Sequence, residues 1–144
     1  MQQALQDGGN KPRVLLAARE IACAPFRESL RDDVEFVEAG TLSEAVSRLE
    51  APEAIDLICC TVYFDESRMF DLLRWARVQR ADIPFICARA LPKDIARISI
   101  EAVRIAADNL GATAFVDVPA LVAEHGEAQA SEKLRGLLLA QLGA

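Results

Sequence analysis

The side chains able to do chemistry in this sequence are few and do not gather into a motif. One histidine, His125, stands in the segment AEHGE, and no serine or cysteine is spaced to act as its nucleophilic partner. We therefore interpret it as a surface residue. The cysteines have neither a CxxC motif nor the spacing of a zinc site, and they are Cys23, Cys59, Cys60 and Cys87. We expect free, buried thiols.

Neither paired carboxylates nor a phosphate-binding loop indicates an active site in this sequence. Asp65 and Glu66 are adjacent acids where a loop meets a helix, and acidic residues there stabilise the helix dipole. The sequence has no GxGxxG motif and no Walker loop. The segment REIACAPF also lacks the glycines and hydroxyls that would cradle a phosphate. We therefore predict no catalytic residues, no cofactor and no metal site, and we do not expect an enzyme.

Alternating strands and helices must position whatever residues the protein uses. Two continuous apolar runs, RVLLAA and IDLICCT, are typical of strands buried on both faces of a sheet. The predicted strands span 13–18, 34–39, 55–61, 83–88 and 113–118. Helical patterns cover PFRESLRDD, LSEAVSRLE, SRMFDLLRWARVQR, LPKDIARISIEAVRIAADNLGA and EAQASEKLRGLLLAQL. Thr41 and Glu44 form a capping box before the second helix, and Gly111 ends the fourth.

This alternation implies an α/β fold with one doubly wound, five-stranded parallel sheet in the order 2-1-3-4-5, a three-layer sandwich. We assign residues 12–144 to a single domain and 1–11 to a flexible lead-in without the pattern of a signal peptide. The net charge of -6 disfavours nucleic acid as a partner. No apolar run reaches the ~20 residues of a membrane span, so we expect a cytoplasmic protein.

The fold predicts where a site should lie. Ligands of open parallel sheets bind beyond the carboxyl ends of the strands, near the reversal of strand order. The residues collected at this rim are Ala18, Arg19 and Glu20, the segment 61–66, Arg89, Asp117 and Val118.

From Lys11 onward, three segments at the rim resemble the receiver domains of two-component response regulators. IDLICCT is similar to the strand that ends in the family's phosphoacceptor aspartate. PFICARA resembles the strand that ends in its switch threonine or serine, and GATAFVDVP resembles its last strand, with Phe115 as the switch aromatic. The resemblance implies a signalling domain that accepts a phosphoryl group with the help of magnesium.

The residues that carry this phosphorylation chemistry are absent. Ala18 and Arg19, with Glu20 just beyond, stand where the family has its magnesium-binding acids, and Thr61 stands at the phosphoacceptor position. Arg89 replaces the switch hydroxyl, and Val118 replaces the family's phosphate-binding lysine. A threonine without a base is a poor nucleophile, and an arginine would repel a divalent cation. The resemblance then implies a degenerate pseudo-receiver, a phosphorylation-independent interaction or regulatory module for a signalling protein partner. The alternative is a sensor, either redox through the cysteines or for a small ligand at the rim.

Arg89 has two possible arrangements. Its side chain would project toward the place of the phosphoryl group, within reach of Glu20, Asp65 and Asp117. A fixed ion pair there would lock one state of the domain, whereas an unpaired side chain would extend into solvent.

The helix from Pro92 carries two apolar stripes, centred roughly 110° apart. We expect the first to face the sheet, and it consists of Ile95, Ile98, Ala102, Ile105 and Ala106. The second consists of Ala96, Ile100, Val103 and Ala107. We predict that it forms a homodimer or partner interface on the face made by the predicted helix 91–112, strand 113–118 and helix 127–142, which corresponds to the face through which receiver-like domains commonly pair. Burial under the last helix is the alternative, and Trp75 is a second surface candidate.

The cysteines on the central strands can also be placed. Cys59 and Cys87 each stand two residues before the predicted strand ends Thr61 and Arg89. We therefore expect them to share one face of the sheet, with Cys60 on the other, as buried and unreactive thiols.

Overall fold

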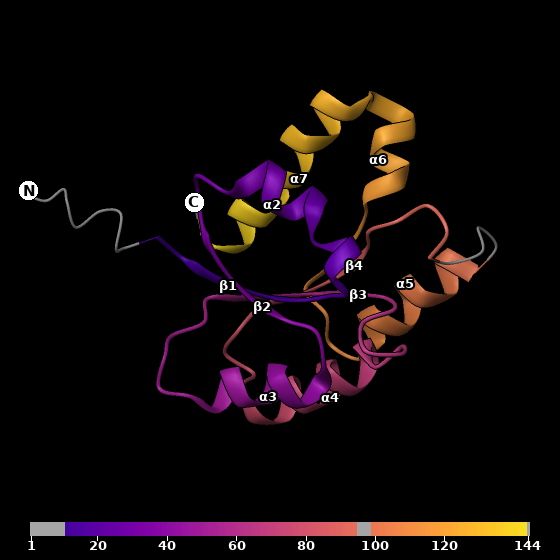
Figure 1. Cartoon of the computed structure of the whole chain (residues 1–144). Coiled ribbons are helices and arrows are strands. Elements are labelled where there is room, and N and C mark those ends of the chain that lie inside the picture. Colours follow the sequence, from indigo (N-terminus) through magenta and orange to yellow (C-terminus); the bar gives the residue numbers. More distant parts are fainter. Residues whose placement is uncertain (1–10, 95–98, 144) are drawn as a thin grey trace, which may run out of the picture.

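A parallel sheet forms the centre of the fold (Figure 1). The computed structural model describes residues 11–94 and 99–143. The strands are β1 (Arg13–Ala17), β2 (Glu35–Ala39), β3 (Leu57–Thr61), β4 (Phe85–Arg89) and β5 (Ala114–Asp117). They pair in the order β2-β1-β3-β4-β5, and every pair is parallel. The predicted α/β topology is confirmed.

Helices cover both faces of this sheet (Figure 1). A short 3-10 helix, η1 (Glu20–Ala22), leads into α2 (Ala24–Leu30), which lies with α7 (Glu127–Gln141) on one face. The other face carries α3 (Leu42–Glu50), α4 (Met69–Gln79) and α5 (Ile100–Asn109). β3 is buried along its whole length because its side chains enter both apolar cores in alternation. In the described part of the chain, no helix is long and apolar enough to cross a membrane.

Local sequence signals start and stop several of these helices as expected. Thr41 Oγ1 accepts a hydrogen bond from the Glu44 N–H at 3.1 Å, and Glu44 Oε1 accepts one from the Gly40 N–H at 2.8 Å. These bonds satisfy amides at the start of α3 that have no partner within the helix. Gly111 follows α5 with a φ of +99°, which a residue with a side chain rarely adopts.

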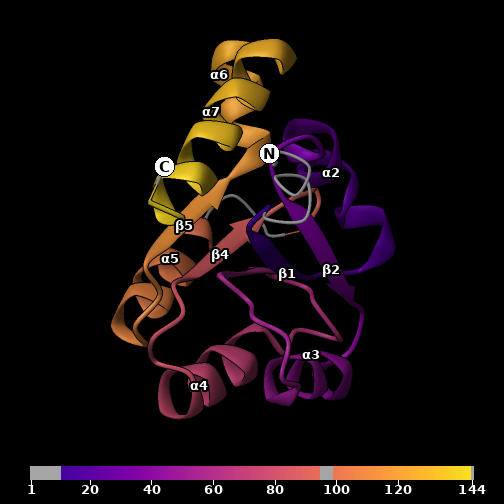
Figure 2. The ribbon, with the colours of Figure 1, turned by 90° about the vertical axis from the view of Figure 1, so that its left-hand side faces the viewer.

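Two helical segments differ from the expected ones. Residues 91–94 form turns, and α5 begins only at Ile100. An additional helix, α6 (Val118–His125), starts directly after β5. Asp117 caps it by accepting a hydrogen bond from the Ala120 N–H at 3.2 Å, and Pro119 fits its first turn. Figure 2 shows β5 leading into α6, with α7 returning toward the sheet.

α5 turns the second of its two apolar stripes toward the core, and not the first stripe as predicted. Ala107 is fully buried, and Ile100 and Val103 pack against the core beneath α3 and α4, whereas Ile105 is 54% exposed. The prediction of an exposed stripe is therefore wrong. Both stripes are apolar, so the helical periodicity alone does not decide which of them is buried. Ile95, Ala96 and Ile98 lie outside the described residues. Trp75 is half-buried against the same core, so it is not a free surface anchor.

The faces of the cysteines also need correction. β3 and β4 pair Cys60 with Cys87, while Cys59 lies opposite Ile86. Cys60 and Cys87 therefore share one face, and Cys59 lies in the other core. The prediction treated Thr61 and Arg89 as opposite each other. In the sheet Thr61 lies opposite Ala88, so β4 extends one residue beyond β3. All four thiols are buried, as predicted.

Candidate functional site

The candidate site is the rim formed by the carboxyl ends of β1, β3, β4 and β5. After β1, Ala18 is buried and Arg19 is exposed to solvent. Arg19 Nη2 donates to Asp94 Oδ1 at 2.7 Å, and the guanidinium lies 5.7 Å from the centre of the Tyr63 ring. Asp94 is buried, and its other oxygen accepts the Leu91 N–H at 3.2 Å. The position expected for a magnesium ligand thus holds a cation that is already paired.

Thr61 ends β3 at the position of the phosphoacceptor. The residue is 1% exposed, and its hydroxyl has no hydrogen-bond partner among the described residues. A buried hydroxyl is unavailable to an incoming phosphoryl donor, and no base contacts it to raise its nucleophilicity. In this structure Thr61 is thus a buried residue at the end of β3.

Arg89 forms the fixed ion pair that the sequence left open. Its Nη1 lies 2.7 Å from Asp117 Oδ1, and both side chains are only 10% exposed. Its Nη2 donates to the carbonyl oxygen of Pro92 at 2.6 Å. The two other candidate partners bind elsewhere, since Glu20 pairs with Arg27 and Asp65 bonds to the start of α3. Arg89 therefore connects β4 to β5 and to the loop before α5.

Val118 occupies the position of the phosphate-binding lysine and is the first residue of α6. It is 7% exposed and packs in the core shared with α2 and α7. An apolar, buried residue here supplies no cation to hold a phosphoryl group. Phe115, at the switch position, is half-buried beneath the guanidinium of Arg104, which lies 4.8 Å from the ring centre.

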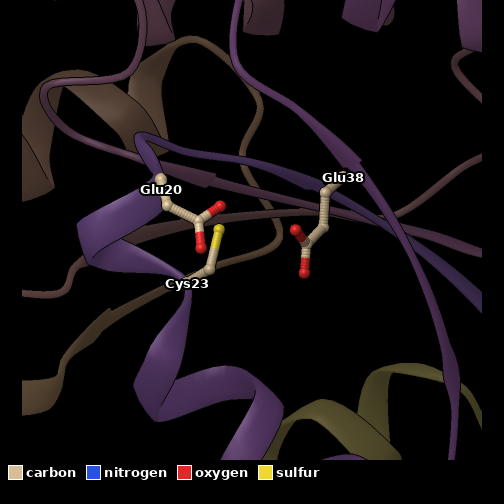
Figure 3. Close-up of side chains that lie close together, drawn as sticks. All are labelled: Glu20, Cys23 and Glu38. Carbon is tan, nitrogen blue, oxygen red and sulfur yellow. The ribbon is translucent and has the colours of Figure 1, made fainter.

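A cluster of possible metal ligands lies beside this rim. Glu20, Cys23 and Glu38 bring one ligand atom each within 4.8 Å of the others (Figure 3). Arg27 already occupies this cluster, with Nη2 2.5 Å from Glu38 Oε1 and Nη1 3.1 Å from Glu20 Oε2. Burial, followed by the charge of Glu38, raises the pKa of the Cys23 thiol to about 11. A compensated acid pair and a protonated thiol do not make a cation site.

The paired acids on the loop after β3 do not lie where we expected. Asp65 Oδ2 accepts the Leu42 N–H at 2.7 Å, so this carboxylate caps α3 rather than α4. Asp65, Glu66 and Ser67 have φ values of 45°, 56° and 72°, which are uncommon for residues with side chains. The bond to Leu42 fixes this turn against a neighbouring helix. His125 ends α6 with Nε2 3.3 Å from Glu124 Oε1.

Solved structures with the same fold extend over most of this chain. A response regulator from Thermotoga maritima matches with a TM-score of 0.69 and 19% identity, covering 93% of this chain and 99% of its own. The fold is that of a response-regulator receiver domain. A receiver domain protein from Methanospirillum hungatei matches this receiver fold with a TM-score of 0.65 and 20% identity, covering 92% and 97%.

A further structure is closer in sequence over a shorter span. The non-phosphorylated HemR receiver domain from Leptospira biflexa is 28% identical, with a TM-score of 0.57, and covers 74% of this chain and 82% of its own. No protein-family model matches the chain, and no curated protein sequence matches it. The receiver fold is thus shown by structural similarity.

Proposed function

We propose that this protein is a pseudo-receiver, a signal-transduction module that binds a protein partner without being phosphorylated. The observation that supports this best is the enclosed ion pair of Arg89 and Asp117, with 2.7 Å between Nη1 and Oδ1. It lies where the receiver resemblance implies the switch hydroxyl and, one residue further, the lysine. A receiver must rearrange this region when it is phosphorylated, whereas here a buried charge pair fixes it.

The remaining rim residues fit the same proposal. Phosphorylation of a carboxylate needs a divalent cation held by oxygen ligands. Arg19 stands at that position and is bonded to Asp94 at 2.7 Å. The rim therefore contains two arginines and two aspartates that neutralise each other. A metal ion would have to displace an arginine before it could bind.

Treatment with acetyl phosphate and magnesium tests the proposal. We expect the intact mass of the protein to stay unchanged, while a phosphorylatable receiver domain treated in parallel gains one phosphoryl group. A phosphoryl adduct on this protein would contradict the proposal. An acid-labile adduct would indicate a carboxylate as acceptor, whereas an acid-stable adduct that is lost in a Thr61→Val variant would assign it to the hydroxyl of Thr61.

The α5–β5 face is the partner surface that fits the structure best. Ile105 is 54% exposed, and Arg104 stacks on Phe115 beside it. Glu101 and Asp108 add negative charge next to Arg104, so the patch has an apolar centre and charges of both signs. Such a patch can pair with itself across a twofold axis. We propose that a second copy binds here, through Ile105 rather than through Ile100 and Val103.

The redox alternative has weaker support. Burial raises the pKa of Cys87 to about 12 and raises that of Cys60 well above the ordinary thiol value. The thiolate is the reactive form of cysteine, so these thiols are protected from oxidants at neutral pH. None of the four cysteines is exposed.

A further inference from the structure

We propose that the cavity between α2, α6 and α7 binds a small apolar molecule that carries one alcohol or amine group. The cavity measures about 580 Å³, within the usual range for small-molecule sites. It exists because α6, the helix inserted after β5, forms one of its walls. The inference does not rest on the pseudo-receiver proposal, since a ligand can bind here whether or not the rim is phosphorylated.

The walls of the cavity are mainly apolar. Ala90 and Val118 line it from the ends of β4 and β5, Leu134 from α7 and Val122 from α6. Ala90, Val118 and Leu134 belong to the core on this face, so an apolar ligand would extend that core. Three surrounding helices favour a compact small molecule as the occupant.

Two hydroxyls supply a polar contact within these walls. Ser29 of α2 and Ser131 of α7 both line the cavity, and their Oγ atoms are 2.7 Å apart. One hydroxyl donates to the other, so the pair keeps one free O–H and several lone pairs. Among the described residues neither hydroxyl has another hydrogen-bond partner. The pair can therefore both donate to and accept from a ligand, as an alcohol or an amine requires.

Charge at the cavity selects against acids. Among the residues that the structure describes, the ionisable ones lining the cavity are Glu28 and Glu127, both exposed, and none of the lining residues is basic. The chain carries a net charge of -6. These negative charges would repel a carboxylate or phosphate ligand and attract an ammonium group, and they would have little effect on an uncharged alcohol.

Two residues that line the cavity are direct sequence neighbours of the rim ion pair. Ala90 directly follows Arg89, and Val118 directly follows Asp117, so a ligand touching both residues contacts the segments that hold the ion pair. Occupancy would therefore be sensed at the rim, where other receivers sense a phosphoryl group.

Titration with three probes of equal chain length tests the inference, with amide chemical shifts recorded by NMR. We expect octan-1-ol and octylamine to shift the amides of Ser29, Val118 and Ser131 in a saturable manner near 1 mM, on the order of weak small-molecule binding. Octanoate should bind at least about fivefold more weakly because of the two carboxylates. Ser131→Ala should weaken octan-1-ol binding by about threefold, the effect of one hydrogen bond.

A pair of alanines on α6 gives a matched control. Ala123 lines the cavity and is exposed, so the larger side chain of Ala123→Phe should fill the cavity. This variant should bind octan-1-ol and octylamine at least about tenfold more weakly. Ala120 is also exposed but does not line this cavity, so Ala120→Phe should leave binding unchanged. Absence of saturable shifts, equal binding of octanoate, or unchanged binding in Ala123→Phe would overturn the inference. Shifts at the same amides that follow protein concentration without any probe would instead assign the cavity to contact between copies.

Discussion

Arg89 ends β4 with its guanidinium almost enclosed, bonded to Asp117 through Nη1 and to the Pro92 carbonyl through Nη2. Asp117 accepts from both Arg89 and the Ala120 N–H, so the same carboxylate neutralises the arginine and caps α6. A buried charge is tolerated only when it is paired, because its removal from water costs several kcal/mol. These two residues therefore hold β4, β5 and α6 in one arrangement.

Replacing Asp117 should reveal how much free energy it costs to bury the charge of Arg89 without a partner. We predict that Asp117→Asn lowers the free energy of unfolding by about 3 kcal/mol, since Arg89 stays buried without a counter-charge while asparagine still caps α6. Urea denaturation measures this loss. Adding Arg89→Met should recover at least half of it, because the uncompensated charge is then gone.

An exposed pair on α4 provides the comparison for this result. Arg74 and Asp71 lie 3.5 Å apart, with side chains 60% and 51% exposed. Arg74→Met should change the free energy of unfolding by less than about 0.5 kcal/mol. If Asp117→Asn costs no more than this control, the rim pair does not stabilise the fold and our account of it is wrong.

The thiols give a second prediction at this scale. Burial raises the pKa of Cys23 to about 11 and that of Cys87 to about 12, so both stay protonated at pH 8. We predict that a thiol reagent labels none of the four cysteines of the native protein within minutes at pH 8, and labels all four in denaturant. Fast labelling of any one in the native protein would favour a redox sensor.

At the scale of elements, the strands could be predicted because their apolar runs are long, and α3 because Thr41 and Glu44 mark its start. The helix α6 was missed although its signals were present, with Asp117 as cap, Pro119 in the first turn and Gly126 after the end. The predicted strand 113–118 includes both Asp117 and Val118, so it overlaps the start of this helix. Side-chain pairing between loops, such as Arg19 with Asp94, has no local signature and could not be predicted.

The orientation of α5 leads to a prediction at the same scale. Ala107→Asp places an unpaired carboxylate in the core and should lower the free energy of unfolding by at least about 3 kcal/mol. Ile105→Asp lies on the exposed side and should change it by less than about 0.5 kcal/mol. Analytical ultracentrifugation should show that Ile105→Asp abolishes self-association of the wild-type protein.

Val78 on α4 is 78% exposed and serves as the control for that experiment. Val78→Asp should leave both stability and self-association unchanged, because Val78 is exposed on a different helix and is not among the residues of the α5–β5 patch. Association of Ile105→Asp at the wild-type level would exclude this face as the interface. A fully stable Ala107→Asp protein would contradict the orientation of α5.

For the whole molecule, a receiver fold carries two ion pairs at the carboxyl ends of its strands. Arg19 with Asp94 and Arg89 with Asp117 tie the ends of β1, β4 and β5 to the loop before α5. The helix α6 adds a wall above the same rim and creates a cavity of about 580 Å³. These features support our proposals that the molecule binds a protein partner and a small ligand and is not phosphorylated.

The most direct test of this account is titration with magnesium and beryllofluoride, a mimic of the phosphoryl group, followed by amide chemical shifts in NMR. We predict no saturable change at the amides of Ala18, Arg19, Thr61, Arg89 or Val118 up to about 20 mM magnesium, because the rim has no free acidic pair to hold the cation. Saturable shifts at these residues at low millimolar magnesium, strengthened by beryllofluoride, would show a working phosphorylation site and contradict the account.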